Sequence, residues 1–319
     1  MTSAEKEYGE GKKRMAASYR EKKKVQNFRR KRRRQECITL IIFLSIPLLF
    51  LFYFSVYPVL SMLYYSFTDW RGTSGSQHFV GWGNYVHVFT NETYRNVFKT
   101  AGYYLAAGVL QQIISLALAV LLSKPMKGNS IFKGIIFFPF IMNGVAVALT
   151  YRIFYQPDGA FDVLLNALGS GGLVRIWLSN PGTVNWALGY VFLWKNVGYS
   201  FLIYLGTMQS ISKEYYDAAA IDGAGTWRQF TAITFPNMKM IIGLMATFSI
   251  VNSIAVFDIP YILTSGKNGT NTFSTTMLET AFTYNKFGEA CAMAIVMLLI
   301  AGLVMILRNC AFREEKDVY

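Results

Sequence analysis

Long apolar segments alternate with short polar ones along most of this chain. About 20 apolar residues span the hydrocarbon core of a bilayer as a helix, and a helix satisfies its own backbone hydrogen bonds there. The pattern therefore predicts an all-α polytopic membrane protein. We predict about six transmembrane helices, near residues 38–66, 97–122, 131–154, 183–208, 239–264 and 284–308. The first is long for one span, and Pro47 and Pro58 predict a kink or a tilt in it.

A polar stretch, residues 209–238, separates the fourth and fifth apolar runs and predicts two short helices. Ser212 can cap the first helix and Gly223 supplies its stop. Thr226 with Gln229 predicts a capping box at the start of the second. Small and polar residues share one face of the first helix by their three-to-four spacing, namely Tyr215, Ala218, Ala219 and Asp222. This face leaves room for a partner to approach closely.

Basic residues are concentrated before the first apolar run. Residues 1–36 hold fourteen of the 31 Lys and Arg but only five of the 18 Asp and Glu. Such an excess favours the cytoplasmic side of a membrane, so we predict that both termini and the stretch 209–238 are cytoplasmic. The predicted domains are a basic tail (1–37), a membrane domain (38–308) and a C-terminal tail (309–319). Phe28 beside the basic run is thin support for base stacking, so we expect the tail to contact membrane lipid and no nucleic acid.

Residues 217–236 carry a specific spacing of small and apolar residues. They resemble the "EAA" loop of sugar-type permease subunits of bacterial ABC importers, which reads Glu-Ala-Ala, three residues, Gly, nine residues, Ile, one residue, Leu-Pro. Asp217 replaces the family's Glu, Phe235 replaces its Leu, and Ser212 stands where a proline is usual. The positions that fit are Asp217, Ala218, Ala219, Gly223, Ile233, Phe235 and Pro236. Further likeness lies at 79–85, 138–139, 159, 206–211 and 263–288.

This resemblance implies a transport machine of several subunits in the bacterial plasma membrane. It implies a second homologous permease, two ATPase subunits that bind ATP-Mg, an extracytoplasmic solute-binding protein and a carbohydrate substrate. The sequence contains no Gly-x-x-x-x-Gly-Lys-Ser/Thr phosphate loop, no Gly-x-Ser-x-Gly elbow and no metal-binding helix, so we predict no catalytic, cofactor or metal site in this chain. The residues predicted to couple it to the ATPases are Glu214, Asp217, Ala218, Ala219, Asp222, Gly223, Trp227, Phe230 and Pro236.

Polar groups within the fourth and fifth apolar runs indicate a solute path, because such groups are costly in lipid. Amides, hydroxyls and aromatic rings together suit a sugar. The candidates are Trp194, Lys195, Asn196, Tyr199, Ser249, Asn252, Ser253, Asp258 and Tyr261. By the resemblance, the positions around Tyr199, Ser249 and Ser253 match sugar contacts of a related maltose-type permease. Asn196 and Asn252 are added from their spacing.

Several alternatives stay open at this stage. Serine and asparagine in spans also bond neighbouring helices, which suits Asn252 equally well. Lys195 and Asp258 can neutralise one another, or Lys195 can attract an anionic solute such as glycerol phosphate. Glu289 is close enough to an interface to be simply hydrated. Two other classes, a receptor or scaffold without transport and a membrane enzyme, are distinguished from a permease by uptake of labelled sugar into vesicles.

Overall fold

The computed structural model describes residues 32–72, 77–123 and 127–311. Within these ranges the chain is helical and has no β-strand beyond one isolated bridge between Thr68 and Phe79. Most of the predicted basic tail (1–37) and residues 312–319 of the predicted C-terminal tail lie outside the described residues. The chain divides into two compact units, residues 1–61 and 62–319.

The first unit contributes most of a 34-residue helix, Arg32–Tyr65. Its residues up to Leu60 are all exposed, and large apolar side chains such as Phe43 cover it on every side. A π-helical turn, η1 (Phe52–Val56), precedes α2 (Tyr57–Tyr65). Pro58 lacks a backbone N–H and its ring crowds the preceding turn, which the wider π-helical turn accommodates. The predicted distortion near Pro58 therefore takes the form of this turn.

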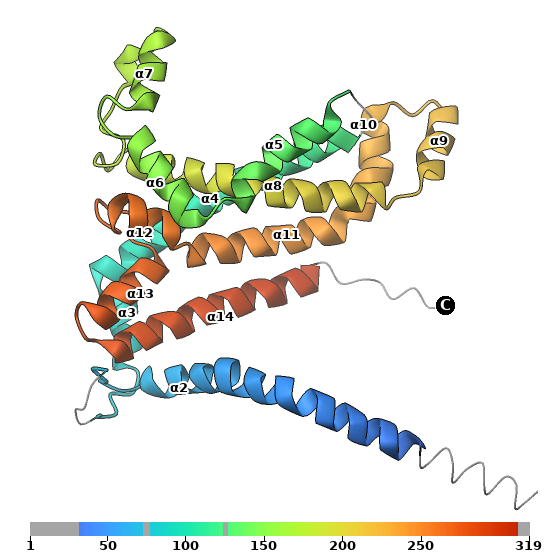
Figure 1. Ribbon diagram of the computed structural model, residues 1–319. Helices are drawn as coiled ribbons and strands as arrows, with labels where there is room; N and C mark the ends of the chain where they lie inside the picture. The colour runs from blue at the N-terminus through green and yellow to red at the C-terminus, as the bar shows by residue number, and fades with distance from the viewer. Residues whose placement is uncertain (1–31, 73–76, 124–126, 312–319) are drawn as a thin grey trace, which may run out of the picture. The chain divides into compact units, whose positions relative to one another are not determined.

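The second unit is built around α8 (Val184–Gln209), which packs against α4 (Glu92–Ser123), α5 (Asn129–Ile141) and α11 (Phe235–Ala255) (Figure 1). The last helix, α14 (Phe287–Ala311), packs against α11. Half of the residues of α8 are buried, so the core of this unit lies along it.

Buried residues form a continuous stripe along α4. They recur every three or four residues, at Tyr94, Val97, Thr100, Tyr104, Gly108, Gln111, Ser115, Ala119 and Leu122. This spacing averages 3.5 residues, the repeat of helices that supercoil around a partner. The stripe explains how α4 packs against α8 over most of its length.

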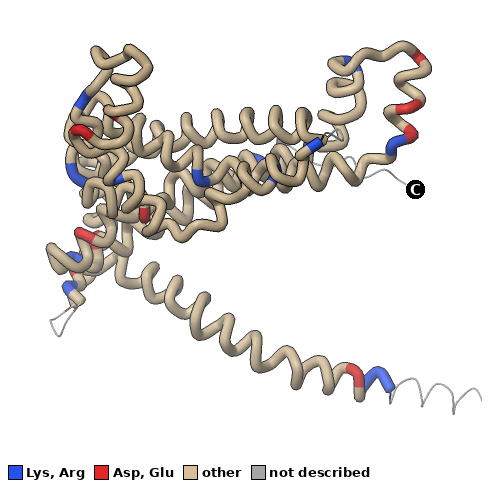
Figure 2. Tube along the Cα trace, turned by 45° about the horizontal axis from the view of Figure 1, so that its top comes forward, with Lys and Arg blue, Asp and Glu red and all other residues tan. Residues whose placement is uncertain are grey.

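Shorter helices lie at the two ends of the second unit. At the predicted outer end are α3 (Gly83–Thr90), α12 (Asp258–Thr264) and α13 (Phe273–Phe282). At the opposite end α9 (Lys213–Ile221) and α10 (Thr226–Gln229) stand beyond α8 and α11 (Figure 1). Figure 2 shows that acidic and basic residues are frequent in α9 and sparse along the long helices. Charge is thus placed where the predicted spans end.

Among the described residues, four helical runs are long and apolar enough to cross a membrane, judged by length and composition: Arg32–Tyr65, Glu92–Ser123, Thr226–Thr264 and Phe287–Cys310. A fifth is added if α5 and α6 (Gly144–Phe154) count as one span. The fourth predicted span coincides with α8, which has 26 residues but is not among these runs. The all-α membrane fold is confirmed, and the count of six spans stays a prediction.

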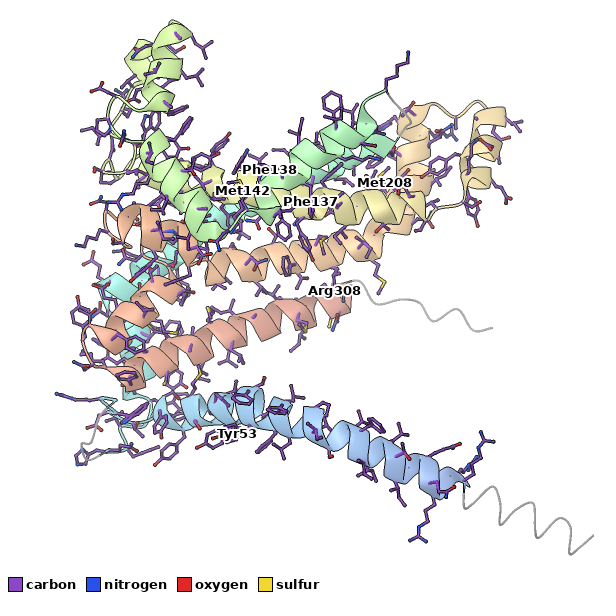
Figure 3. All side chains as sticks on the ribbon, viewed as in Figure 1. Tyr53, Phe137, Phe138, Met142, Met208 and Arg308 are labelled. Atoms are coloured by element: carbon purple, nitrogen blue, oxygen red, sulfur yellow. The ribbon has the colours of Figure 1, made fainter. Side chains whose placement is uncertain are left out.

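The predicted helix over 131–154 is broken into two helices. The chain bends by 96° between α5 and α6. Asn143 causes the break, because its side chain accepts a hydrogen bond from the Val145 N–H at 2.8 Å and so caps a new helix. Phe137, Phe138 and Met142 lie around this bend (Figure 3). After α6 the chain continues through α7 (Ala160–Ala167) and a short 3-10 turn, Gly171–Leu173.

Candidate functional site

The first helix of the predicted coupling loop (209–238) begins and ends where the sequence predicts. The Glu214 N–H donates to Ser212 Oγ at 3.3 Å, which makes Ser212 the N-cap of α9. Glu214 lies in the first turn, where the helix dipole favours a negative charge. Gly223 follows α9 with φ +76°, a left-handed conformation that favours glycine. The predicted cap and stop are both confirmed.

The second helix begins differently from the prediction. Gly225 is the N-cap of α10 and makes no side-chain cap hydrogen bond, so the predicted Thr226–Gln229 capping box is wrong. Thr226 is already the first helical residue, and Gln229 Nε2 instead donates to the Ala224 carbonyl at 3.1 Å. The helix then widens into a π-helical segment, η3 (Phe230–Thr234), before α11. Pro236 is the second residue of α11, a position that needs no backbone N–H.

The predicted coupling residues form an exposed surface. Glu214, Asp217, Ala218 and Asp222 are exposed, and Ala219 is half-buried. Large apolar side chains project beside them, with Ile221 87% and Trp227 76% exposed. Trp227 stacks on the half-buried Phe230, with ring centroids 5.7 Å apart. None of the acidic side chains of α9 forms an ion pair with another residue that the structure describes.

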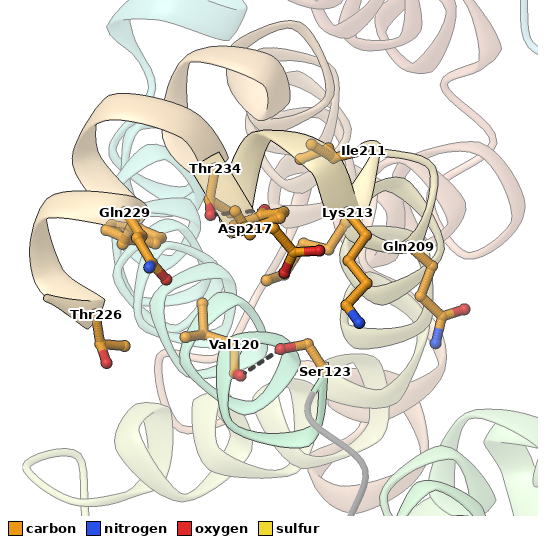
Figure 4. A pocket seen from close by; sticks show the side chains of 12 residues that line it. Val120, Ser123, Gln209, Ile211, Lys213, Asp217, Thr226, Gln229 and Thr234 are labelled. Atoms are coloured by element: carbon orange, nitrogen blue, oxygen red, sulfur yellow. Dashed lines mark hydrogen bonds between the residues drawn. The ribbon is translucent and has the colours of Figure 1, made fainter. Parts of the chain in front are cut away.

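A pocket of about 360 Å³ lies behind α9 (Figure 4). Its walls come from the ends of α4 and α8, from α9, and from the segment that leads into α11. The lining residues are Val120, Ser123, Met208, Gln209, Ile211, Lys213, Tyr216, Asp217, Thr226, Gln229, Phe230 and Thr234. One hydrogen bond joins α9 to the opposite wall, between Tyr216 Oη and Thr234 Oγ1 at 3.0 Å. Sequence reasoning did not single out this pair.

The structure brings the two charged path candidates together at the bend between α5 and α6. A Cβ built on Gly144 would meet both Asp258 Oδ2 and Lys195 Nζ, so these two atoms lie on either side of the same point. They form no direct ion pair within 4.0 Å. Lys195 therefore has an acidic side chain in its neighbourhood. The pairing of these two charges, one of the open alternatives, stays a prediction.

Aromatic path candidates lie in small ring clusters. Tyr199 stacks on Phe140 with centroids 4.9 Å apart and contacts Phe248 at 5.5 Å. Trp194 packs edge-on against Tyr151. Tyr261 stacks on Phe257 at 4.8 Å and remains 45% exposed. The rings of Tyr199 and Tyr261 therefore belong to different neighbourhoods, one beside α5 and α11 and the other at α12.

The serine and asparagine candidates differ in accessibility. Ser249 and Ser253 are only 5% and 1% exposed. Ser249 Oγ faces Gly108 of α4 and lacks a hydrogen-bond partner among the described residues, whereas Ser253 Oγ donates to the Ile250 carbonyl. Asn196 Nδ2 donates to the Phe192 carbonyl, and Asn252 is half-buried. These residues stay predictions as path residues.

A buried polar network between α4 and α8 was missed by sequence reasoning. Gln111 Nε2 donates to Ser200 Oγ at 2.8 Å and to the Asn196 carbonyl at 3.1 Å. Gln112 Oε1 accepts a hydrogen bond from the Tyr204 hydroxyl at 2.7 Å, and Gln112 Nε2 donates to the Met245 carbonyl of α11. Hydrogen bonds of this kind between helices satisfy polar side chains that would have no partner in lipid. Two adjacent glutamines inside an apolar run were the available signal.

The predicted outer end contains a second network, which we call the outer anchor: Ser66, Thr68, Asn84, Tyr85, His87, Tyr94, Lys286, Gly288 and Glu289. Glu289 accepts from the Tyr94 hydroxyl at 2.8 Å and from Lys286 Nζ at 2.9 Å, and it contacts His87 Nδ1 at 3.1 Å. Its side chain is only 15% exposed, so the interpretation of Glu289 as merely hydrated is wrong.

The motif at 79–85 supplies the other half of the outer anchor. Asn84 Nδ2 donates to the Ser66 and Thr68 carbonyls, each at 2.8 Å. Tyr85 Oη lies 2.7 Å from Ser66 Oγ. The backbone N–H of Gly288 donates to the Trp70 carbonyl at 3.0 Å. These bonds join α3, the beginning of α14 and the segment after Tyr65.

A family described as "Binding-protein-dependent transport system inner membrane component" matches residues 24–313. The chain is 30% identical over 283 residues to the osmoprotective compounds uptake permease protein GgtC of Synechocystis sp., covering 87% of this chain and 100% of that protein. It is 31% identical over 273 residues to the multiple sugar-binding transport system permease protein MsmF of Streptococcus mutans, covering 83% and 92%.

A solved structure has a similar fold. It is a chain from a bacterial ABC transporter involved in the import of the acidic polysaccharide alginate, with a TM-score of 0.76 at 19% sequence identity. The match covers 87% of this chain and 96% of that one. The arrangement of helices described above is therefore shared with a solved ABC transporter chain.

Proposed function

Because this chain belongs to the family of binding-protein-dependent transport system inner membrane components, we propose that it is the membrane-spanning permease subunit of an ATP-driven sugar importer. In this proposal it forms half of the solute pathway in the bacterial plasma membrane. Its partners are a second homologous permease, two ATPase subunits that bind ATP-Mg, and an extracytoplasmic binding protein. The chain itself hydrolyses no ATP, in keeping with its lack of a phosphate loop.

The observation that carries this proposal is the exposed loop formed by α9 and α10. The loop has the small-residue spacing of the permease family. Its first helix ends at the left-handed Gly223, and the side chains of Ile221 and Trp227 are exposed. Large apolar side chains rimmed by charge are typical of a protein interface. We assign this surface to the ATPases, whose closure would move α9 and change which side of the membrane the pathway faces.

The sugar class is supported by the chemistry of the pathway candidates. Rings such as Tyr199 and Tyr261 can cover the apolar faces of a sugar, and Asn252 offers an amide for hydroxyl groups. Lys195 lies beside Asp258, which argues against a preference for anions. The name of the relative MsmF, a multiple sugar-binding transport system permease, points in the same direction.

Transport by the reconstituted complex tests the function. The chain, its partner permease, the ATPases and the binding protein are placed in vesicles, and uptake of labelled di- and trisaccharides is measured with and without ATP. We expect uptake of at least one sugar that requires both ATP and the binding protein. Uptake by the permease pair without ATPases, or ATP hydrolysis by the purified chain alone, would contradict the proposal.

A pair of glycine variants tests the coupling assignment within the same assay. Gly223→Asp forces a β-carbon into a left-handed conformation, and we expect it to abolish uptake while the subunit still inserts. Gly225→Asp is the matched control, because Gly225 has φ −68° and aspartate suits its N-cap position. Normal uptake by the Gly223 variant would remove the coupling role of the loop.

A different solute is the second candidate. The relative GgtC is named for the uptake of osmoprotective compounds, so the same machinery accepts other cargo within the family. Glycerol phosphate and glycine betaine therefore belong in the uptake panel. ATP-dependent uptake of one of these, with no uptake of any sugar, would keep the permease assignment and replace the substrate class.

A further inference from the structure

We propose that Tyr216 and Thr234 are positioning residues whose hydrogen bond transmits the movement of α9 to α11. The inference rests on the permease function proposed above and deepens it. It assigns a transmission contact to two residues that lie behind the docking surface and that the loop motif does not include.

α9 has little else to hold it against the rest of the chain. None of its residues belongs to a hydrophobic core cluster, and it packs closely against no other helix that the structure describes. The pocket of about 360 Å³ separates it from the ends of α4 and α8 (Figure 4). Because a pocket contains no packed side chains, it cannot transmit a push. The contacts that cross it therefore decide how α9 moves α11.

Tyr216 is the large side chain of α9 that turns inward. Its neighbour Tyr215 is 63% exposed, whereas Tyr216 is half-buried and lines the pocket. Its hydroxyl lies 3.0 Å from Thr234 Oγ1. Among the described residues no other side-chain hydrogen bond joins α9 to a residue beyond its own flanking loops.

Thr234 behaves differently from the other threonines of these helices. Thr207, Thr231 and Thr247 each donate their hydroxyl to a carbonyl one turn earlier in the same helix. The Thr234 hydroxyl is instead bonded to Tyr216. Thr234 is only 3% exposed, so without Tyr216 this hydroxyl would be buried away from water. Burial of an unpaired polar group is unfavourable, so the Tyr216–Thr234 hydrogen bond should persist while α9 moves.

The location of Thr234 suits a transmission contact. It is the last residue of the π-helical segment η3 and immediately precedes α11. π-Helical segments inside α-helices are often found at functional sites, because their hydrogen-bond register can shift. α11 also carries Ser249, Asn252 and Ser253, the pathway candidates of the fifth predicted span. A displacement of α9 at Tyr216 therefore reaches the helix that contributes to the pathway.

The test measures how far ATPase closure is transmitted to the pathway, in the assembled transporter in vesicles. Asn252→Cys serves as a reporter on α11 after Cys37, Cys291 and Cys310 are replaced by serine. The rate of labelling by a membrane-impermeant maleimide is compared in nucleotide-free complexes and in complexes trapped with MgATP and vanadate. Phosphate release gives the rate of ATP hydrolysis in parallel. No transported solute is needed for the labelling readout.

We expect Tyr216→Phe and Thr234→Val each to reduce the nucleotide-dependent change in labelling about fivefold, the factor that corresponds to one ordinary hydrogen bond. The double variant should be no worse than either single one, because both remove the same bond. Thr234→Ser retains the hydroxyl and should restore the response. Thr231→Val and Tyr284→Phe are matched controls that lose a hydroxyl elsewhere.

The outcomes separate this inference from the proposed function. An unchanged labelling response in Tyr216→Phe and Thr234→Val, or effects that multiply in the double variant, would overturn the transmission role. Fewer assembled complexes with a normal response per complex would also overturn it, since that pattern indicates only a structural role. If the reference complex shows no nucleotide-dependent labelling change, the proposed function itself fails. If Gly223→Asp retains normal uptake, only the coupling role of the loop fails.

Discussion

The outer anchor and the coupling loop lie near opposite ends of α4, and they are held in opposite ways. In the outer anchor, Glu289 is shared by three side chains and Asn84 bonds two backbone carbonyls. In the coupling loop, a single side-chain hydrogen bond among the described residues joins α9 to η3, the segment that leads into α11. Several hydrogen bonds therefore hold the outer anchor together, whereas α9 of the coupling loop lies beside a pocket.

This difference separates residues that stabilise the subunit from residues that make it work with partners. Substitutions in the outer anchor should lower the stability of the chain itself. Substitutions on the exposed surface of the loop should leave the isolated chain stable and affect only the assembled complex.

The largest effect is expected at Gly288. A Cβ there would run into the Thr68 carbonyl and would lie 3.1 Å from Asn84 Nδ2. Because the obstacle is backbone, Gly288→Val should destabilise the subunit by about 3 kcal/mol. Gly302→Val, in the same helix but with open space around it, is the control and should be nearly neutral. Thermal unfolding in detergent measures both, and equal stabilities would contradict the anchor.

Glu289→Leu should have the next largest effect. It removes the acceptor of Tyr94 and leaves Lys286 without its ionic partner. Hydrogen bonds to a charged group contribute about 1.5 to 3 kcal/mol, so a loss of about 2 kcal/mol is expected in the same unfolding measurement. Glu289→Gln keeps an acceptor and should lose less. A leucine variant as stable as the parent would show that this network contributes nothing.

Trp227→Ala tests the opposite side of the comparison. Since Trp227 is 76% exposed, the change should alter the stability of the isolated subunit by no more than about 0.5 kcal/mol. An exposed tryptophan that becomes buried in an interface is a typical hot spot, so binding of the ATPase subunits should weaken about thirtyfold. Co-purification and binding titration check the second part. A destabilised subunit with normal ATPase binding would reverse the interpretation.

The smallest effect is expected at Asp69, outside the membrane. The backbone N–H of His78 donates to its Oδ1 at 2.7 Å and the His78 ring lies 3.1 Å from Oδ2; these contacts lower the pKa of Asp69. A lowered pKa adds stability at pH values above the ordinary range near 4, and that stability is lost as the pH falls through the folded value. Asp69→Asn should therefore unfold slightly earlier than the parent at pH 7, with the gap closing below about pH 4. A gap that widens on acidification would contradict this.

Local features of the coupling loop could be predicted because they depend on neighbouring residues. Ser212 Oγ accepts from an amide only two residues away, and the glycine at position 223 suits the left-handed conformation of its own backbone. The start of α10 was predicted wrongly because several polar residues could serve as its cap, and Gly225 does so without a side chain. The bend at Asn143 was missed because apolar residues continue on both sides of it.

Contacts between helices could not be predicted from spacing alone. The bond between Tyr216 and Thr234 joins residues eighteen positions apart, and Glu289 meets Tyr94 across 195 positions. Such pairs depend on how the helices rotate and pack, which the periodicity of one helix does not determine. The proximity of Lys195 and Asp258 was foreseen as one of two options because charges within a membrane span need partners. The packing around Gly144 places the two side chains near each other.

The length of α4 has a consequence for the lipid environment. With 32 residues it is about 48 Å long, whereas the hydrocarbon layer is about 30 Å thick. Its first turns bear Tyr94 of the outer anchor, and its last turn supplies Val120 and Ser123 to the pocket behind α9. Shorter-chain lipids would make this rod lean further and shift both ends together. The transport rate should therefore depend on acyl-chain length even when no protein atom is altered.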